Sequence, residues 1–257
     1  AQLMIEGVRV GDAWADGVAE AFLDDPEQPA SVRQAAAARA LRTLCAPAMR
    51  RKLACSAVST PSQTTFMPSA RPTLITAEHG FNAQPNQWRL DRALSGGGSL
   101  MDIGIYSLNA ARYLAGEEPV EVVATEATDR NDPRFRNVED RIDFQMKFPS
   151  GVIANCVSSY SSGHNAYRVT GTRGWVGMEP ATPYEGHQMW TRQNGKTEQV
   201  TLPTPKKNQF VAQLDHFPES ILTGVPLRAS GEEGLRDMKL IEAIYRSARE
   251  RRAVALV

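Results

Sequence analysis

Asp102 and Tyr106 are the two side chains whose types and spacing most directly indicate chemistry in this sequence. They lie four residues apart in SGGGSLMDIGIYSLNAARYLAG, a segment with the apolar pattern of an amphipathic helix. On a helix they project from one face, one turn apart, and Asn109 continues that line. A carboxylate and a phenol can both exchange protons. A tyrosine with the usual pKa of about 10 needs a nearby cation or hydrogen bonds to act as a base at neutral pH.

The same helix start has explanations that involve no ligand. Ser99 and Asp102 have the spacing of a capping box, in which the acid stabilises the positive end of the helix dipole. Gly104 costs about 1 kcal/mol relative to alanine in a helix, so a ligand or another backbone is expected to use its space. The three glycines before Ser99 offer N–H groups to an anion or form a flexible linker. No GxGxxG follows a predicted strand.

Composition narrows the class of protein. The 257 residues carry 29 basic and 29 acidic side chains, a balance that argues against nucleic acid or a charged membrane and favours a small-molecule partner. No apolar run is long enough to span a membrane, and no signal peptide is expected. Three cysteines without CxxC spacing favour a reducing, cytoplasmic location. The four histidines lack spacing such as HxxxH, so no metal is expected.

The elements that must hold Asp102 and Tyr106 are mostly strands. Eight short β-rich runs follow one another from Pro72 onward: PTLITAE, PVEVVATEA, EDRIDFQMKF, GVIANCVSSY, NAYRVTGT, RGWVGMEP, HQMWTRQ and TEQVTL. Turn residues at 149–151 and at Asn194 and Gly195 close two hairpins. We therefore expect sequential antiparallel pairing.

Two further helices are predicted. One covers residues 231–250. Ser230, just before it, and Glu233 have the spacing of a capping box. A shorter helix covers NQFVAQLDHF and is expected to end before Pro218. Together these elements predict an α+β fold, with an open-faced, mostly antiparallel sheet and helices packed on one side. The other face of the sheet could cover a partner.

The N-terminal segment 1–71 differs in amino-acid composition from residues 72–257, which we treat as a separate α+β domain. No acid occurs between Glu27 and Glu78, although seven basic residues do. The alternatives are a solvated helical segment, a misplaced targeting-like peptide and a segment translated out of frame. A complete Rossmann domain is not evident, because about 70 residues are too few for both of its halves.

One long segment, EHGFNAQPNQWRLDRALSGGGSLMDIGIYSLNAARYLAGEEPVEV, resembles the start of the second domain of the Gfo/Idh/MocA family. Within that family it is most similar to the glucose-fructose (aldose) oxidoreductase branch. The resemblance continues through DPRFRNVEDRIDFQMKFPSG and SGEEGLRDMKLIEAIYRSA, and covers about residues 72–252. It implies an open-faced sheet domain that binds a sugar and forms homo-oligomers, either dimers or tetramers. It also implies hydride transfer between a cyclic aldose and NADP or NAD.

The resemblance implies roles for residues at matching positions. Asp102 would orient the substrate, and Tyr106 would relay the proton of its hydroxyl. The implied cofactor-binding residues are Trp88, Arg89 and Tyr184, and the implied substrate-binding residues are Asn109, Asp215 and His216.

Two motifs of the family are missing from the 257-residue sequence. One is GxGxxG, and the other is an E-K-P motif whose lysine, in the family, prepares the catalytic tyrosine to act as a base. The sequence therefore predicts an aldose oxidoreductase whose cofactor-binding domain is lacking or poorly retained. The alternative is a catalytically inactive sheet domain that binds a sugar or assembles oligomers. A metal-dependent hydrolase is a distant third.

Overall fold

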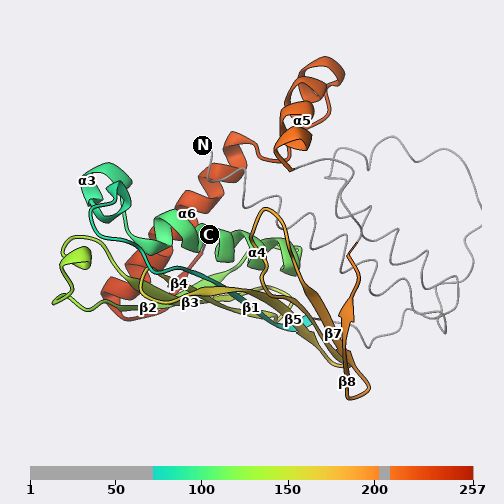
Figure 1. Ribbon diagram of the computed structural model, residues 1–257, viewed down its shortest axis with the longest axis horizontal. Helices are drawn as coiled ribbons and strands as arrows, with labels where there is room; N and C mark the ends of the chain where they lie inside the picture. The colour runs from blue at the N-terminus through green and yellow to red at the C-terminus, as the bar shows by residue number, and fades with distance from the viewer. Residues whose placement is uncertain (1–71, 203–208, 257) are drawn as a thin grey trace, which may run out of the picture.

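The computed structural model describes residues 72–202 and 209–256, so the predictions for residues 1–71 lie outside the described part. Within it, one nine-stranded sheet carries helices on one face (Figure 1). The strands are β1 (Pro72–Gly80), β2 (Glu121–Ala127), β3 (Arg141–Lys147), β4 (Ile153–Ser159), β5 (His164–Gly171), β6 (Gly174–Met178), β7 (Met189–Gln193), β8 (Lys196–Val200) and β9 (Val254–Ala255). The α-helices are α3 (Arg92–Ser95), α4 (Ile105–Ala115), α5 (Gln209–Thr223) and α6 (Gly231–Glu250).

All eight predicted strands are present, and the short β9 is added at the sheet edge next to β2. The strand order is β8-β7-β6-β5-β1-β4-β3-β2-β9. Every pair is antiparallel except β1 with β4, which run parallel from Leu74 opposite Ile153 to Gly80 opposite Ser159. The expected sequential pairing is therefore wrong for β1 with β2 and for β4 with β5, because β1 lies between β4 and β5. β1 is separated from β2 by a long segment that contains α3 and α4, so no hairpin pattern in the sequence indicated its partners.

The core lies between the sheet and the two helices α4 and α6. Ile75 and Ala77 of β1 are fully buried on the helix-covered face. Removing these apolar side chains from water stabilises the packing of the helices on the sheet. The core also includes Ile142, Phe144, Met146, Ala154, Leu108, Ala111, Leu240, Ile241 and Ile244. On β2, β3 and β4 the alternate residues Val123, Gln145 and Asn155 are exposed, so this face of the sheet is open as predicted.

Helix α6 begins as predicted, whereas α5 is longer than predicted. The Ser230 hydroxyl accepts a hydrogen bond from the Glu233 N–H at 3.3 Å, which caps α6. Helix α5 continues through Pro218 to Thr223. A proline removes one intrahelical bond, but the turn after it closes on itself, since the Thr223 hydroxyl donates to the Glu219 carbonyl at 2.6 Å.

A buried ion-pair network fixes α4 against α6. Arg112 of α4 donates to Asp237 of α6 at 2.6 Å and to Glu118, in the loop after α4, at 2.7 Å. The Glu233 carboxylate lies 2.6 Å from the same guanidinium. These pairs set the position of the helix whose first turns carry Asp102 and Tyr106.

Candidate active site

Asp102 lies at the centre of a hydrogen-bonded group contributed by three segments. Its side chain is 8% exposed and sits in the π-helical turn Leu100–Gly104 that leads into α4. The Oδ2 atom accepts hydrogen bonds from Arg89 Nη1 at 2.6 Å and from the Tyr160 hydroxyl at 2.7 Å. Arg89 comes from the turn Trp88–Leu90, and Tyr160 directly follows β4. These two donors fix the orientation of the carboxylate and partner its charge.

Tyr160 is a member of this group that the sequence reasoning missed. Burial, and then the neighbouring Asp102, raise the pKa of its hydroxyl far above the usual value. The hydroxyl therefore stays protonated and remains a donor to Asp102. Tyr160 ends a predicted strand 58 residues after Asp102, and no spacing rule links the two.

Glu139, from the loop before β3, caps the helix start. Its Oε2 accepts from the Gly98 N–H at 2.8 Å, and its Oε1 accepts from the Leu100 N–H at 3.0 Å. The Tyr245 hydroxyl of α6 also donates to Oε1, at 2.7 Å. The anion at this helix N-terminus is thus the protein's own buried carboxylate.

The capping box predicted from Ser99 and Asp102 is wrong. Ser99 makes no side-chain capping bond, and its hydroxyl instead lies 3.1 Å from the hydroxyl of Ser158 on β4. The physical reason is that both N–H groups a capping box would use have backbone acceptors: the Ser99 N–H donates to the Glu139 carbonyl at 3.3 Å and the Asp102 N–H to the Gly98 carbonyl at 3.2 Å. Asp102 is consequently available to Arg89.

Glycine is required where these segments approach one another. A Cβ on Gly98 would stand 2.1 Å from the Glu139 carbonyl oxygen, and a Cβ on Gly97 would stand 2.3 Å from the Tyr245 hydroxyl. A Cβ on Gly104 would stand 3.0 Å from the Cβ of Ser158. The space beside Gly104 is therefore taken by β4 and not by a ligand.

Tyr106 lies one turn after Asp102 and borders the same group. Its ring stacks on the imidazole of His79 from β1, with ring centroids 4.8 Å apart and planes 13° apart. It also packs against the small apolar cluster that contains Ile103 and Tyr160. Burial lowers the pKa of His79 to about 4, so its imidazole is neutral at neutral pH. His79 is a second residue that the sequence reasoning did not place in the site.

Tyr167 of β5 carries a buried hydroxyl to which the described residues offer no hydrogen-bond partner. Burial, then Tyr106 and Cys156, raise its pKa well above the usual value. An unsatisfied buried hydroxyl costs about 1–3 kcal/mol. We therefore expect Tyr167→Phe to raise the unfolding free energy of the ligand-free chain by about 1 kcal/mol, as measured by urea denaturation.

The matched control for this prediction is Tyr245→Phe. It removes a hydroxyl that is hydrogen-bonded to Glu139, so it should lower the unfolding free energy. A clear loss of stability in Tyr167→Phe would show that its hydroxyl has a partner in the folded protein.

The three residues predicted to bind cofactor are all aromatic or cationic groups near the surface. The Trp88 side chain is 52% exposed, and the Arg89 guanidinium lies 5.5 Å from its ring centroid. The Tyr184 side chain is 63% exposed and meets Phe210 of α5 edge-on at 5.2 Å. Of the three, Arg89 contacts Asp102 directly.

The residues predicted to bind substrate are spread over two helices. Asn109 is buried and donates to Asp237 Oδ2 at 3.2 Å, so it takes part in the contact between α4 and α6. Asp215 and His216 lie on α5, where His216 Nε2 accepts from the Arg228 N–H at 3.3 Å. A substrate role for these three residues stays a prediction.

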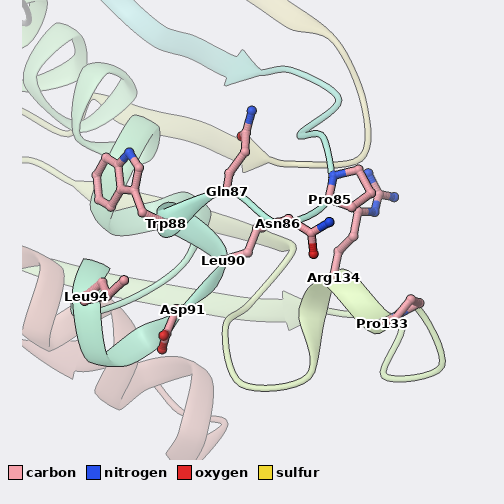
Figure 2. Close-up of a pocket in the computed structure, with 9 residues that line it drawn as sticks. All are labelled: Pro85, Asn86, Gln87, Trp88, Leu90, Asp91, Leu94, Pro133 and Arg134. Carbon is pink, nitrogen blue, oxygen red and sulfur yellow. The ribbon is translucent and has the colours of Figure 1, made fainter.

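An open pocket of about 540 Å³ lies beside Trp88 (Figure 2). It is lined by Pro85, Asn86, Gln87, Trp88, Leu90, Asp91, Leu94, Pro133 and Arg134. Its charged groups are already engaged, since Asp91 caps α3 and Arg134 is paired with Asp132. The pocket therefore offers a surface next to Trp88 but no uncommitted charge of its own.

The described ranges, 72–202 and 209–256, contain neither a candidate metal site nor a candidate membrane span. No three His, Cys, Asp or Glu side chains are grouped so that they could hold a metal ion. None of the helices in these ranges combines the length and the apolar character that crossing a membrane would need.

The chain is similar to several proteins named as oxidoreductases or dehydrogenases of sugars. It is 35% identical over 175 residues to D-xylose 1-dehydrogenase [NADP(+)] of Haloarcula marismortui, covering 67% of this chain and 48% of the relative. The structure of aldose-aldose oxidoreductase from Caulobacter crescentus, complexed with glycerol, matches with a TM-score of 0.70 at 57% identity, covering 72% of this chain and 56% of that one. The chain thus spans about half the length of the curated relatives it matches.

More distant structures share the fold. Levoglucosan dehydrogenase, solved with NADH and levoglucosan, matches with a TM-score of 0.60 at 18% identity, covering 72% of this chain and 59% of that one. At that identity the likeness shows the fold alone. Relatives thus use NADP or NADH.

The family model described as the oxidoreductase family C-terminal α/β domain matches residues 71–256, which is most of the chain. The residues that form the sheet, the helices and the group around Asp102 all lie within this match. The chain therefore belongs to the Gfo/Idh/MocA family of NAD(P)-dependent oxidoreductases, and residues 71–256 correspond to its C-terminal α/β domain.

Proposed function

We propose that residues 72–257 form the substrate-binding domain of an aldose oxidoreductase, which transfers a hydride between a cyclic aldose and NADP or NAD. The observation that carries this proposal is the Asp102 group. A buried carboxylate is held by Arg89 and Tyr160, and the phenol of Tyr106 lies one turn further along. The similarity to aldose-aldose oxidoreductase and to xylose dehydrogenase supports a sugar as the substrate.

The residues around Trp88 fit the nicotinamide end of a dinucleotide. Arg89 Nε and Gln87 Oε1 are buried atoms that lack a hydrogen-bond partner in the described residues. One is a donor and the other an acceptor, and the carboxamide of a nicotinamide offers one group of each kind. The exposed rings of Trp88 and Tyr184 are the aromatic groups that would contact the cofactor. The pyrophosphate has no match here, because GxGxxG is absent from the sequence.

The side chains of this domain would manage the proton while the bound nicotinamide supplies the hydride acceptor. Tyr106 would take the proton of the carbinol hydroxyl as its C–H bond breaks. Asp102, fixed by Arg89, would orient that hydroxyl. The hydroxyl of Tyr160 is committed to Asp102, and its raised pKa excludes it as the base.

The second candidate function is a catalytically inactive domain that binds a sugar or assembles oligomers. One observation favours it: the open face of the sheet. That face includes the exposed side chains of Val123, Gln145 and Asn155 and is the surface through which we propose a homo-oligomer forms. Oligomer assembly is compatible with either function, so nucleotide binding and turnover must separate them.

Titration with NADPH tests the missing phosphate site. We expect the 257-residue chain to bind NADPH weakly or not at all, because no glycine-rich turn presents its N–H groups to a pyrophosphate. NADPH fluorescence is the measurement. Saturable binding in the low micromolar range would show that a nucleotide site exists elsewhere in the chain.

Turnover is tested in a fusion that places the dinucleotide-binding domain of an NAD(P)-dependent relative before Pro72. This fusion should reduce NADP when D-xylose or D-glucose is added. A fusion that binds both NADPH and aldose but never turns over would support the inactive sheet domain and contradict the oxidoreductase proposal.

A further inference from the structure

The imidazole of His79 is held by a chain of hydrogen bonds that fixes which nitrogen carries the proton. His79 Nδ1 lies 3.0 Å from the Thr182 hydroxyl oxygen. The same hydroxyl lies 2.9 Å from Asn165 Oδ1. His79 and Asn165 are paired residues on the neighbouring strands β1 and β5.

Asn165 determines the direction of this chain. Its Oδ1 accepts the backbone N–H groups of Ala181 at 2.8 Å and Thr182 at 2.7 Å, so this atom is the amide oxygen and acts as an acceptor. The Thr182 hydroxyl must therefore donate its single proton to Asn165. Its oxygen can then only accept from His79, which places the imidazole proton on Nδ1 and the lone pair on Nε2.

The Nε2 lone pair has no partner in the described part of the chain. No hydrogen bond joins it to a described residue, and it is not among the buried atoms that lack one, so solvent can reach it. The ring remains neutral at neutral pH because burial lowers its pKa to about 4. A solvent-accessible, uncharged acceptor is thus stacked on the proposed proton relay Tyr106 at 4.8 Å between ring centroids.

We propose that His79 is a substrate-binding residue whose Nε2 accepts a hydrogen bond from a hydroxyl of the sugar, with Thr182 and Asn165 as the residues that set its tautomer. This inference rests on the proposed function and adds to it a specificity-determining contact. A sugar hydroxyl is a natural donor for this lone pair. Because the imidazole is stacked on Tyr106, the hydroxyl it binds belongs to a sugar lying beside the reacting group.

The tautomer is tested first, by ¹⁵N–¹H NMR of the histidine side chains in the 257-residue chain. The expected result is a His79 ring protonated at Nδ1, with a Nε2 resonance that shifts when D-xylose or D-glucose is added. Thr182→Val removes the acceptor for Nδ1–H and should populate the Nε2–H tautomer. A wild-type ring protonated at Nε2 would overturn the proposal.

Sugar affinity is tested with variants of the ring. His79→Phe keeps the stacking surface and removes both nitrogens, so the Kd for the aldose should rise about 3- to 10-fold, the usual worth of one neutral hydrogen bond. His79→Gln, which can place an oxygen near the position of Nε2, should recover part of the loss. His164→Gln is the control: His164 contacts Ser162 and Glu78, and its loss should leave the Kd unchanged.

The outcomes separate the two proposals. If the wild-type chain binds aldose and His79→Phe binds it equally well, the role of His79 is overturned while the proposed function stands. If the wild-type chain binds no aldose, the sugar assignment itself fails, and the role of His79 fails with it.

Discussion

Tyr106→Phe is expected to lower kcat for aldose oxidation by about 10² to 10⁴, the usual contribution of general acid–base catalysis. Phenylalanine keeps the ring that stacks on His79 but removes the hydroxyl that would take the substrate proton. The affinity for NADP should change little, because Tyr106 is not among the residues proposed to hold the nicotinamide. Steady-state kinetics of the fusion enzyme at saturating NADP would measure both quantities.

The control for this variant is Tyr113→Phe, which removes another phenol from the same helix α4. It should leave kcat unchanged. If Tyr106→Phe retained nearly full activity, the carboxylate and phenol one turn apart would have to be explained by packing alone.

The largest effect on stability is expected from Glu139→Ala. The carboxylate is 3% exposed and accepts two backbone N–H groups and the Tyr245 hydroxyl. Hydrogen bonds to a charged group are worth about 1.5–3 kcal/mol each, and the alanine would leave three buried donors unsatisfied. The unfolding free energy should therefore fall by about 3–6 kcal/mol, measured by urea denaturation.

Glu139→Gln separates the contribution of the negative charge to the unfolding free energy from that of the side chain's size and shape. Glutamine keeps one acceptor oxygen but turns an NH₂ group toward an N–H donor, so the loss should be intermediate. The turn that holds Asp102 begins at these N–H groups, and both variants should also raise KM for the aldose in the fusion enzyme. A Glu139→Ala protein as stable as the wild type would mean that the glycine turn is held by other contacts.

The sequence predicted the positions of the strands and helices better than it predicted which strands pair in the sheet. Alternating and β-branched residues located all eight longer strands, and the Ser230 cap located the start of α6. These signals are local, because they depend on side-chain periodicity and on caps within a few residues. The position of β1 between β4 and β5 depends on contacts between residues far apart in the chain. No local pattern in the sequence predicts such contacts.

The candidate site shows the same division. The spacing of Asp102 and Tyr106 on one helix face is a local property, and the Trp88-Arg89 pair was found by resemblance. Tyr160 and Glu139 reach this helix from segments tens of residues away. Ser99 and Asp102 had the right spacing for a capping box, but the Ser99 N–H donates to the Glu139 carbonyl, a contact between residues far apart in the chain that spacing could not predict.

β1 joins the two halves of the sheet, because it pairs with β4 on one side and with β5 on the other. On either side of it, most neighbouring strands are also successive in sequence and can pair through short connections. Ala77 must instead find both Cys156 and Tyr167, and pairing over such separations is slow because loop-closure entropy is lost before contacts form. During synthesis both pairings of β1 therefore become possible only after β5 has been made. A free peptide with the sequence of residues 72–80 is therefore expected to compete with β1 for its place between β4 and β5 during refolding, and to have little effect on the protein once it has folded.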